Sequence, residues 1–298
     1  MNVVPIQLGD LGLGGNERDE PVPSTSAFPD GTHYRIEIPS VEGPEAFGVV
    51  VAEAERRGVR VHRVSQGSGI SMLTKSEISE MVAIGADSAI EVCLFTGPRA
   101  GWDIGAQSRS SAGSTIAPAA RGGSQLLFAV RDVARACDLG VRSVLLGDIG
   151  VIWSVARLRS LGELPADLVI KSSVALPSAN PAAARVLSEL GVDSLNLPVD
   201  LTIGQISSIR SAVEVPLDCY IESPDDFGGC VRHHEISAIV EVAMPIYLKF
   251  AVRNSPPLYP AGEQIRGVVL SSAAERVRRA AIGLEHLDAA QSRFRISP

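Results

Sequence analysis

The sequence ELGVDSLNL at residues 189–197 combines the end of a helix, a glycine turn and the start of a buried strand. The pattern returns as RRGVRVHRV at 56–64, AIGADSAIEV at 83–92 and DLGVRSVLL at 138–146. Glycine commonly follows the last helical residue, where it adopts a left-handed conformation that ends the helix. Before the 189–197 stretch, Asn180 and Pro181 predict the N-cap and first turn of a helix that Gly191 ends.

Working outward from these repeats, strand and helix patterns alternate along the whole chain from residue 33 onward. Strands separated by helices predict a parallel sheet. Eight such units predict an α/β fold of the closed (β/α)8 TIM-barrel type, and the alternative is an open doubly wound sheet. No GxGxxG follows the first strand, so a dinucleotide-binding fold is weakly supported. The predicted strands are 34–39, 59–65, 88–95, 141–148, 167–173, 192–197, 216–222 and 245–251.

The first 32 residues differ from the rest of the chain. They are rich in glycine, proline and acidic residues and show no hydrophobic periodicity, which is typical of an extension or arm. We therefore divide the chain into an arm, 1–32, and a catalytic barrel domain, 33–298. Because an arm of this kind often becomes ordered on a second subunit, we expect a homo-oligomer, specifically a homodimer.

Composition limits the classes of partner and the location. A net charge of −7 gives no basic surface for nucleic acid, so none is expected as a partner. No apolar run reaches the length of about 18 residues that spans a membrane, and no secretion signal opens the sequence. The four cysteines, 93, 137, 219 and 230, form no CxxC pair. These features together predict a reduced, cytoplasmic protein.

The strand PLDCYIE at 216–222 carries Asp218, Tyr220 and Glu222 on one face, because side chains alternate along a strand. A parallel strand covered by helices would be apolar on both faces. An unpaired buried charge costs several kcal/mol, so these residues predict an active site at the carboxyl end of the barrel. A network of paired charges that only satisfies itself is the alternative. The same rule points other polar residues inward: Arg35, Glu37, Glu91, Lys171, Asn196, Tyr247 and Lys249.

These residues fit three kinds of chemistry. In the first, Glu222 and Lys249 form an acid–base pair beside Lys171, and a Mg²⁺ or Mn²⁺ ion stabilises an enolate. In the second, a buried lysine forms a Schiff base with a carbonyl substrate. In the third, Glu222 activates water for hydrolysis. The predicted catalytic residues are Glu222, Lys249, Lys171 and Asp148, and the predicted metal ligands are Glu37, Glu91, Asp148 and Glu222.

The loops predict a substrate with negative charge. Small residues in SQGSGIS at 65–71 can bring backbone N–H groups close to an anion. The long loop 96–122 has the length of a lid, and its arginines can bind a carboxylate or phosphate. The predicted substrate-binding residues are Ser65, Gln66, Arg99, Asn196, Arg253 and Asn254.

Two phrases, ESPDDFGG at 222–229 and YLKFAVRN at 247–254, resemble a subgroup of peptidase family U32, and the resemblance covers about 33–290. It implies a barrel fold and a hydrolase of the peptidase type. In some relatives it also implies a four-cysteine iron–sulfur cluster. Here only Cys230 lies near one of those cysteine positions, so an iron–sulfur cluster is not expected.

The sequence therefore predicts a cytoplasmic barrel enzyme that acts on a small anionic, carbonyl-containing molecule. Lyase, aldolase-type or proton-transfer chemistry is the favoured reaction class. A U32-type peptidase or other hydrolase is the alternative enzyme class. The non-enzymatic alternative is a ligand-binding barrel or a subunit of a larger complex.

Overall fold

A computed structural model describes residues 7–14, 17, 21–97, 99–102, 106–111, 113–114, 117–290 and 293–298 of the chain. It confirms the predicted fold class: eight parallel strands close into a barrel in the order β1 to β8, a (β/α)8 TIM barrel. β8 pairs with β1, so the sheet has no open edge and the doubly wound alternative is wrong. The strands are β1 Tyr34–Pro39, β2 Arg63–Gln66, β3 Glu91–Phe95, β4 Ser143–Leu146, β5 Val169–Ser172, β6 Ser194–Asn196, β7 Leu217–Glu222 and β8 Ile246–Phe250.

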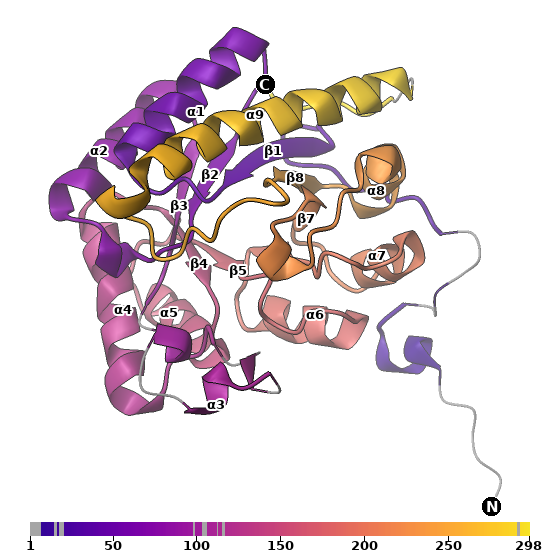
Figure 1. The fold of residues 1–298 in the computed structure, drawn as a ribbon. Coiled ribbons are helices and arrows are strands. Elements are labelled where there is room, and N and C mark those ends of the chain that lie inside the picture. The colour runs from indigo at the N-terminus through magenta and orange to yellow at the C-terminus, as the bar shows by residue number, and fades with distance from the viewer. Residues whose placement is uncertain are drawn as a thin grey trace, which may run out of the picture.

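Helices surround the barrel, and the long α9 runs beside α1 (Figure 1). Their boundaries follow local capping: the Asn180 side chain accepts from Ala183 N at 2.9 Å and begins α6 as predicted. The helices are α1 Pro44–Arg57, α2 Lys75–Ser88, α3 Ala106–Arg109, α4 Gly122–Asp138, α5 Ile149–Ser160, α6 Pro181–Glu189, α7 Ile203–Arg210, α8 Ile236–Ala243 and α9 Arg266–Ala289.

Glycine has two different roles at the predicted helix ends. Gly58 ends α1 in the left-handed conformation, with φ of 65°, as predicted. Gly85 does not end α2, which continues to Ser88. A Cβ at residue 85 would lie 2.8 Å from the carbonyl oxygen of Ile90, so glycine there permits close packing of α2 against the following chain.

The apolar core lies between the strands and the helices, as expected for parallel strands covered on their outer face. Outward strand residues such as Ile36, Leu94 and Ile170 are fully buried and belong to one cluster with helix residues such as Phe47 and Ile206. The inner face of the barrel is polar instead. Charged groups therefore lie on the barrel axis, and apolar packing occurs between the outer face of the strands and the helices.

The amino-terminal end of the barrel is covered by segments from both ends of the described chain. Phe28 lies edge-on to the Tyr247 ring, with centroids 5.5 Å apart, and the Arg35 guanidinium lies 4.2 Å from the centroid of Phe28. Ser297 N donates to the Tyr34 carbonyl at 3.2 Å. Ser24 N donates to the Glu241 carbonyl at 2.8 Å, so this part of the predicted arm is bound to its own barrel.

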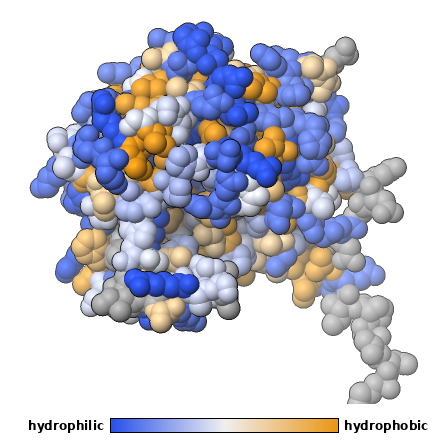
Figure 2. Space-filling view, viewed as in Figure 1, coloured by the Kyte–Doolittle hydropathy of each residue, from blue (hydrophilic) through white to orange (hydrophobic). Residues whose placement is uncertain are grey.

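Residues 7–14 lie beside α6 and α7, where the Arg185 side chain donates to the Gly12 carbonyl at 3.3 Å (Figure 1). The predicted homodimer stays a prediction. Within the described ranges, no helix has the length and apolarity needed to cross a membrane. The face shown in Figure 2 is mostly hydrophilic, with hydrophobic residues in small groups.

His62 joins this end of the barrel to the carboxyl terminus, and its geometry predicts an acid-sensitive stability. Its Nδ1 accepts from Ile36 N at 2.9 Å, and its Nε2 lies 3.0 Å from the Ser297 carbonyl oxygen. Protonating Nδ1 would remove the acceptor for Ile36 N. Burial lowers the pKa of His62 from 6.5 to about 4.

The folded state therefore keeps His62 neutral where the unfolded chain binds a proton. We expect this residue to contribute stability above pH ~6.5 and to lose about 3 kcal/mol of it as the pH falls toward ~4. Urea unfolding of the wild type and His62→Gln at pH 7.5, 6, 5 and 4 measures this. The free energies of unfolding should differ between the two proteins by an amount that depends on pH. If the free energies of unfolding of the two proteins changed with pH in parallel, the neutral, buried state assigned to His62 would be wrong.

Candidate functional site

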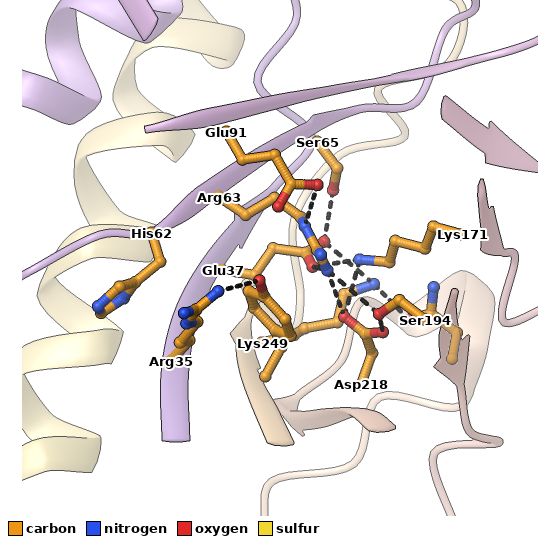
Figure 3. Close-up of polar contacts among 12 residues, drawn as sticks. Arg35, Glu37, His62, Arg63, Ser65, Glu91, Lys171, Ser194, Asp218 and Lys249 are labelled. Carbon is orange, nitrogen blue, oxygen red and sulfur yellow. Dashed lines mark hydrogen bonds and ion pairs between the residues drawn. The ribbon is translucent and has the colours of Figure 1, made fainter. Parts of the chain in front are cut away.

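A network of charged side chains fills the inside of the barrel (Figure 3). Asp218 on β7 lies 2.9 Å from Arg63 on β2 and 3.0 Å from Lys171 on β5. Glu37 on β1 also binds both cations, with Arg63 Nη1 at 3.3 Å and Lys171 Nζ in direct contact. All four side chains are almost completely buried. Two acids and two bases from four strands therefore meet on the barrel axis.

Neighbouring groups extend the network and complete its charge balance. Glu91 Oε1 lies 2.8 Å from Arg63 Nε, and Lys249 Nζ lies 3.4 Å from Glu37 Oε1. Three carboxylates thus face three cations. Ser65 donates to Glu37 at 2.7 Å, and the Ser194 hydroxyl donates to Asp218. The Tyr247 ring supports Arg63, whose Cζ lies 3.6 Å from the ring centroid.

The electrostatics of the network favour the charged forms of Glu37 and Arg63. Burial by itself would raise the pKa of Glu37, but Lys171, Lys249 and Arg63 hold that pKa well below its usual value. Burial would lower the pKa of Arg63, but Glu91, Tyr247, Asp218 and Glu37 raise it well above its usual value. Most of these charges are consequently satisfied by one another, which is the self-paired network that the sequence left as an alternative.

A cavity of about 620 Å³ opens at the carboxyl end of the barrel, above this network. Loops after several strands close it, and the long loop after β3 contributes the largest number of lining residues. Size and position are those of a ligand site in a barrel enzyme. Its described lining includes Ser40, Ser65, Gln66, Phe95, Arg99, Trp102, Ser173, Asn196, Tyr220, Asp226, Phe227, Lys249 and Tyr259.

Lys249 belongs to both the network and the cavity. Its Nζ donates to Asn196 Oδ1 at 2.6 Å, faces Glu37 at 3.4 Å and lies 4.3 Å from the centroid of the Tyr220 ring. Only 2% of the side chain is exposed. A buried ammonium with fixed partners therefore forms part of the cavity wall, where it can meet a bound anion or carbonyl oxygen.

Arg99 supplies a second cation to the cavity, as the sequence predicts. Its Cζ lies 3.8 Å from the centroid of Phe95 and 4.3 Å from that of Trp102, and it donates to the Gly67 carbonyl. Its Nε is buried and has no hydrogen-bond partner among the described residues. Burial lowers the pKa of Arg99 to about 10. An anion in the cavity would compensate this poorly paired charge.

Glu222 does not face Lys249 or Lys171, which corrects the predicted acid–base pair. A register shift on β7 between Tyr220 and Glu222 breaks the alternation on which that prediction depended. Glu222 Oε2 lies 3.4 Å from His233 Nε2 and 3.6 Å from Arg279 Nε on α9, and Oε1 accepts from Arg253 N at 2.9 Å.

The four predicted metal ligands do not share one site. Asp148 caps α5, where Oδ1 accepts from Val151 N at 2.9 Å and Oδ2 from Ala120 N at 3.1 Å. Glu37 and Glu91 bind Arg63, and Glu222 lies elsewhere. Within the described part of the chain, no three His, Cys, Asp or Glu side chains gather as metal ligands do. Use of Mg²⁺ or Mn²⁺ stays a prediction.

The loop at 65–71 binds an anion, but that anion is part of the protein. Glu42 accepts from Gly67 N at 2.7 Å and from Ser68 N at 3.0 Å, and Gln66 Oε1 accepts from Gly69 N at 3.0 Å. The backbone donors that we predicted for a substrate are therefore occupied.

Arg253 and Asn254 are not among the residues that line the cavity, although we predicted that they would bind the substrate. Both are exposed, and Arg253 lies 3.8 Å from Asp225. Ser65, Gln66, Arg99 and Asn196 do line the cavity.

Sequence reasoning missed several residues of the network and the cavity. The prediction does not include Arg63, although His62 and Val64 on either side of it point outward and alternation then points Arg63 inward. Asp218 lies on the polar face of 216–222, but the prediction gives it no role. Trp102 and Tyr259 come from loops, where no periodicity reveals which way a side chain points.

No protein-family model matches the sequence, and no curated protein matches it. Among solved structures, similarity extends to the U32 peptidase Mk0906, with 14% identity, 78% of this chain, 98% of that chain and a TM-score of 0.44. A 3-hexulose-6-phosphate synthase is 12% identical, and the match covers 82% of this chain and 99% of that chain with a TM-score of 0.44. An oxaloacetate acetylhydrolase is 11% identical, and the match covers 73% of this chain and 75% of that chain with a TM-score of 0.46. Similarities this low support no inference about family or activity.

The network predicts that Lys171 contributes to stability. Replacing it with Met leaves Glu37 and Asp218 buried with one cation fewer, and breaking such a pair costs about 3–5 kcal/mol. Arg278→Met is the matched control, because its pair with Glu275 is exposed and contributes about 0–1 kcal/mol. Urea unfolding at pH 7 compares the two variants. Equal, small losses in both would show that the network does not stabilise the barrel.

Proposed function

We propose that the protein is an enzyme that binds a small anionic carbonyl compound in the carboxyl-end cavity and moves a proton beside the carbonyl group. Removal of that proton would form an enolate. Carbon–carbon cleavage or formation next to the carbonyl would pass through the same enolate, so lyase or aldolase-type activity belongs to this proposal. The observation that carries it is the buried Lys249 ammonium in the wall of the 620 Å³ cavity.

Three groups that attract a cation surround Lys249 Nζ. They are the Glu37 carboxylate, the side-chain amide oxygen of Asn196 and the face of the Tyr220 ring. An ammonium held in place can donate a hydrogen bond to a carbonyl oxygen and stabilise the negative charge that grows on it. The proposal therefore gives Lys249 an electrostatic role rather than that of a Schiff-base nucleophile.

The reaction also needs a base for the carbon-bound proton. Glu222, the predicted base, lies away from Lys249, whereas Asp226 in the loop after β7 lines the cavity. We assign this proton to Asp226 and the carboxylate of the substrate to Arg99. In this arrangement Lys249 and Arg99 bind the oxygen atoms of the substrate, and the Asp226 carboxylate removes the proton from carbon.

Hydrogen–deuterium exchange tests the proposal without a known substrate. The wild type should accelerate exchange at the carbon beside the carbonyl of pyruvate and larger 2-oxo acids in D₂O, followed by NMR. Loss of the fixed charge in Lys249→Met should slow exchange about 10²–10³-fold. Asp226→Asn should also lose the acceleration of exchange. Arg253→Met should retain it, because the Arg253 side chain lies outside the cavity wall.

Three outcomes would change or refute the assignment. Borohydride treatment with a 2-oxo acid that labels Lys249 would replace the electrostatic role with Schiff-base chemistry. Exchange that survives in Lys249→Met would refute the proposal. Metal-independent cleavage of peptides by the wild type, lost in the same variants, would favour the hydrolase alternative.

A further inference from the structure

Aromatic side chains are concentrated around the cavity. The chain has two tryptophans, four tyrosines and seven phenylalanines, which make up only 4% of its residues. Five of these thirteen line the one cavity: Phe95, Trp102, Tyr220, Phe227 and Tyr259. Ligand pockets are commonly lined by hydrophobic and aromatic side chains, so this concentration of rings indicates that the cavity accepts an apolar part of a ligand.

Four of the five rings come from two opposite sides of the barrel. Phe95 ends β3 and Trp102 belongs to the loop after it, whereas Tyr220 and Phe227 come from β7 and its loop. In a closed ring of eight strands, β3 and β7 are four strands apart and therefore face each other. Tyr259, from the loop after β8, lies on the side between these two walls, where its ring packs against Gly67 in the loop after β2.

Each wall is held in place by other contacts. Arg99 stacks on Phe95 and Trp102, with Cζ 3.8 Å and 4.3 Å from the two ring centroids. The Tyr259 hydroxyl shares a hydrogen bond with Ser40. Phe227 packs in a small apolar cluster with Tyr220. Contacts of this kind hold the rings in place before a ligand binds, and Lys249 with Asn196 adds polar groups beside Tyr220.

The volume of the cavity exceeds what a small 2-oxo acid needs. Six heavy atoms at about 30 Å³ each, the share of a water molecule in the liquid, occupy about 180 Å³. That is less than a third of 620 Å³. A twelve-atom molecule that adds a six-membered ring would occupy about 360 Å³ by the same measure. Apolar atoms make up most of the cavity surface, and serines and other polar side chains make up the rest.

We infer that the substrate carries a planar ring, with its carbonyl directed to Lys249, its carboxylate directed to Arg99, and the ring lying between the two aromatic walls. The substrate class is an aromatic or cyclic 2-oxo acid rather than a short aliphatic one. This inference rests on the proposed function for the chemistry of the head group, but the ring slot is tested separately.

Carboxylates without a carbonyl group isolate the ring slot from the reaction. Calorimetric titration should give 3-phenylpropionate at least about tenfold higher affinity than propionate, because the ring buries apolar surface. Trp102 lines the cavity and Trp153 is exposed on α5, so Trp153→Phe leaves Trp102 as the single tryptophan. In that variant, 3-phenylpropionate should change the tryptophan emission and propionate should not.

Variants locate the ring. Trp102→Ala and Phe227→Ala should each reduce the preference for 3-phenylpropionate about threefold to tenfold, the range of one aromatic contact. Phe128→Ala is the matched control, because Phe128 is exposed on α4 and lies outside the cavity wall. Equal affinities for the two carboxylates, no measurable binding of either, or unchanged Trp102 emission would overturn the inference.

The two proposals fail in different ways. If the ring slot is wrong but the function is right, pyruvate will bind and exchange as well as phenylpyruvate, with both depending on Lys249. If the function is wrong but the slot is right, 3-phenylpropionate will still bind between Trp102 and Phe227 while no 2-oxo acid exchanges its protons.

Discussion

The contact between Glu37 and the cations around it is the constraint on which the inside of the barrel depends. One carboxylate from β1 faces Lys171, Arg63 and Lys249, which come from β5, β2 and β8. Because β5 lies opposite the neighbouring strands β8, β1 and β2, the network joins the two sides of the barrel through its centre. A buried network is not by itself evidence of high stability, since well-packed apolar residues often serve as well. What it does impose is interdependence, because removing one member leaves its buried partners with one opposite charge fewer.

That interdependence separates two roles that the sequence could not distinguish. Lys171 is fully buried and binds only within the network, so its charge is satisfied by Glu37 and Asp218. Lys249 is bound to the same Glu37 but also reaches the cavity. The buried charges of the network, through Glu37, thereby hold Lys249 in position at the cavity. An ammonium fixed before the substrate arrives needs little reorganisation during the reaction, which is the physical advantage of placing it on such a support.

The fold was predictable because its signals are local and repeated. Each helix–glycine–strand phrase gives one unit, and the closed ring requires only that eight of them follow one another. The inward polar residues were predictable for the same reason, since Glu37, Lys171, Asn196 and Lys249 follow strict alternation. The predictions were wrong where a local irregularity changes direction. At Glu222 a register shift turns the side chain toward α9, and at residues 65–71 a distant carboxylate, Glu42, occupies the backbone donors.

The cavity wall was the least predictable part, and the reason is physical. Strand residues obey a two-residue period, but Trp102, Phe227 and Tyr259 lie in loops whose paths depend on tertiary contacts. Alternation therefore identifies the charged floor and says nothing about the aromatic sides. In the proposed reaction, these sides determine which molecule can present its carbonyl to Lys249. The strands would then fix the chemistry, and the loops after β3, β7 and β8 would determine the substrate.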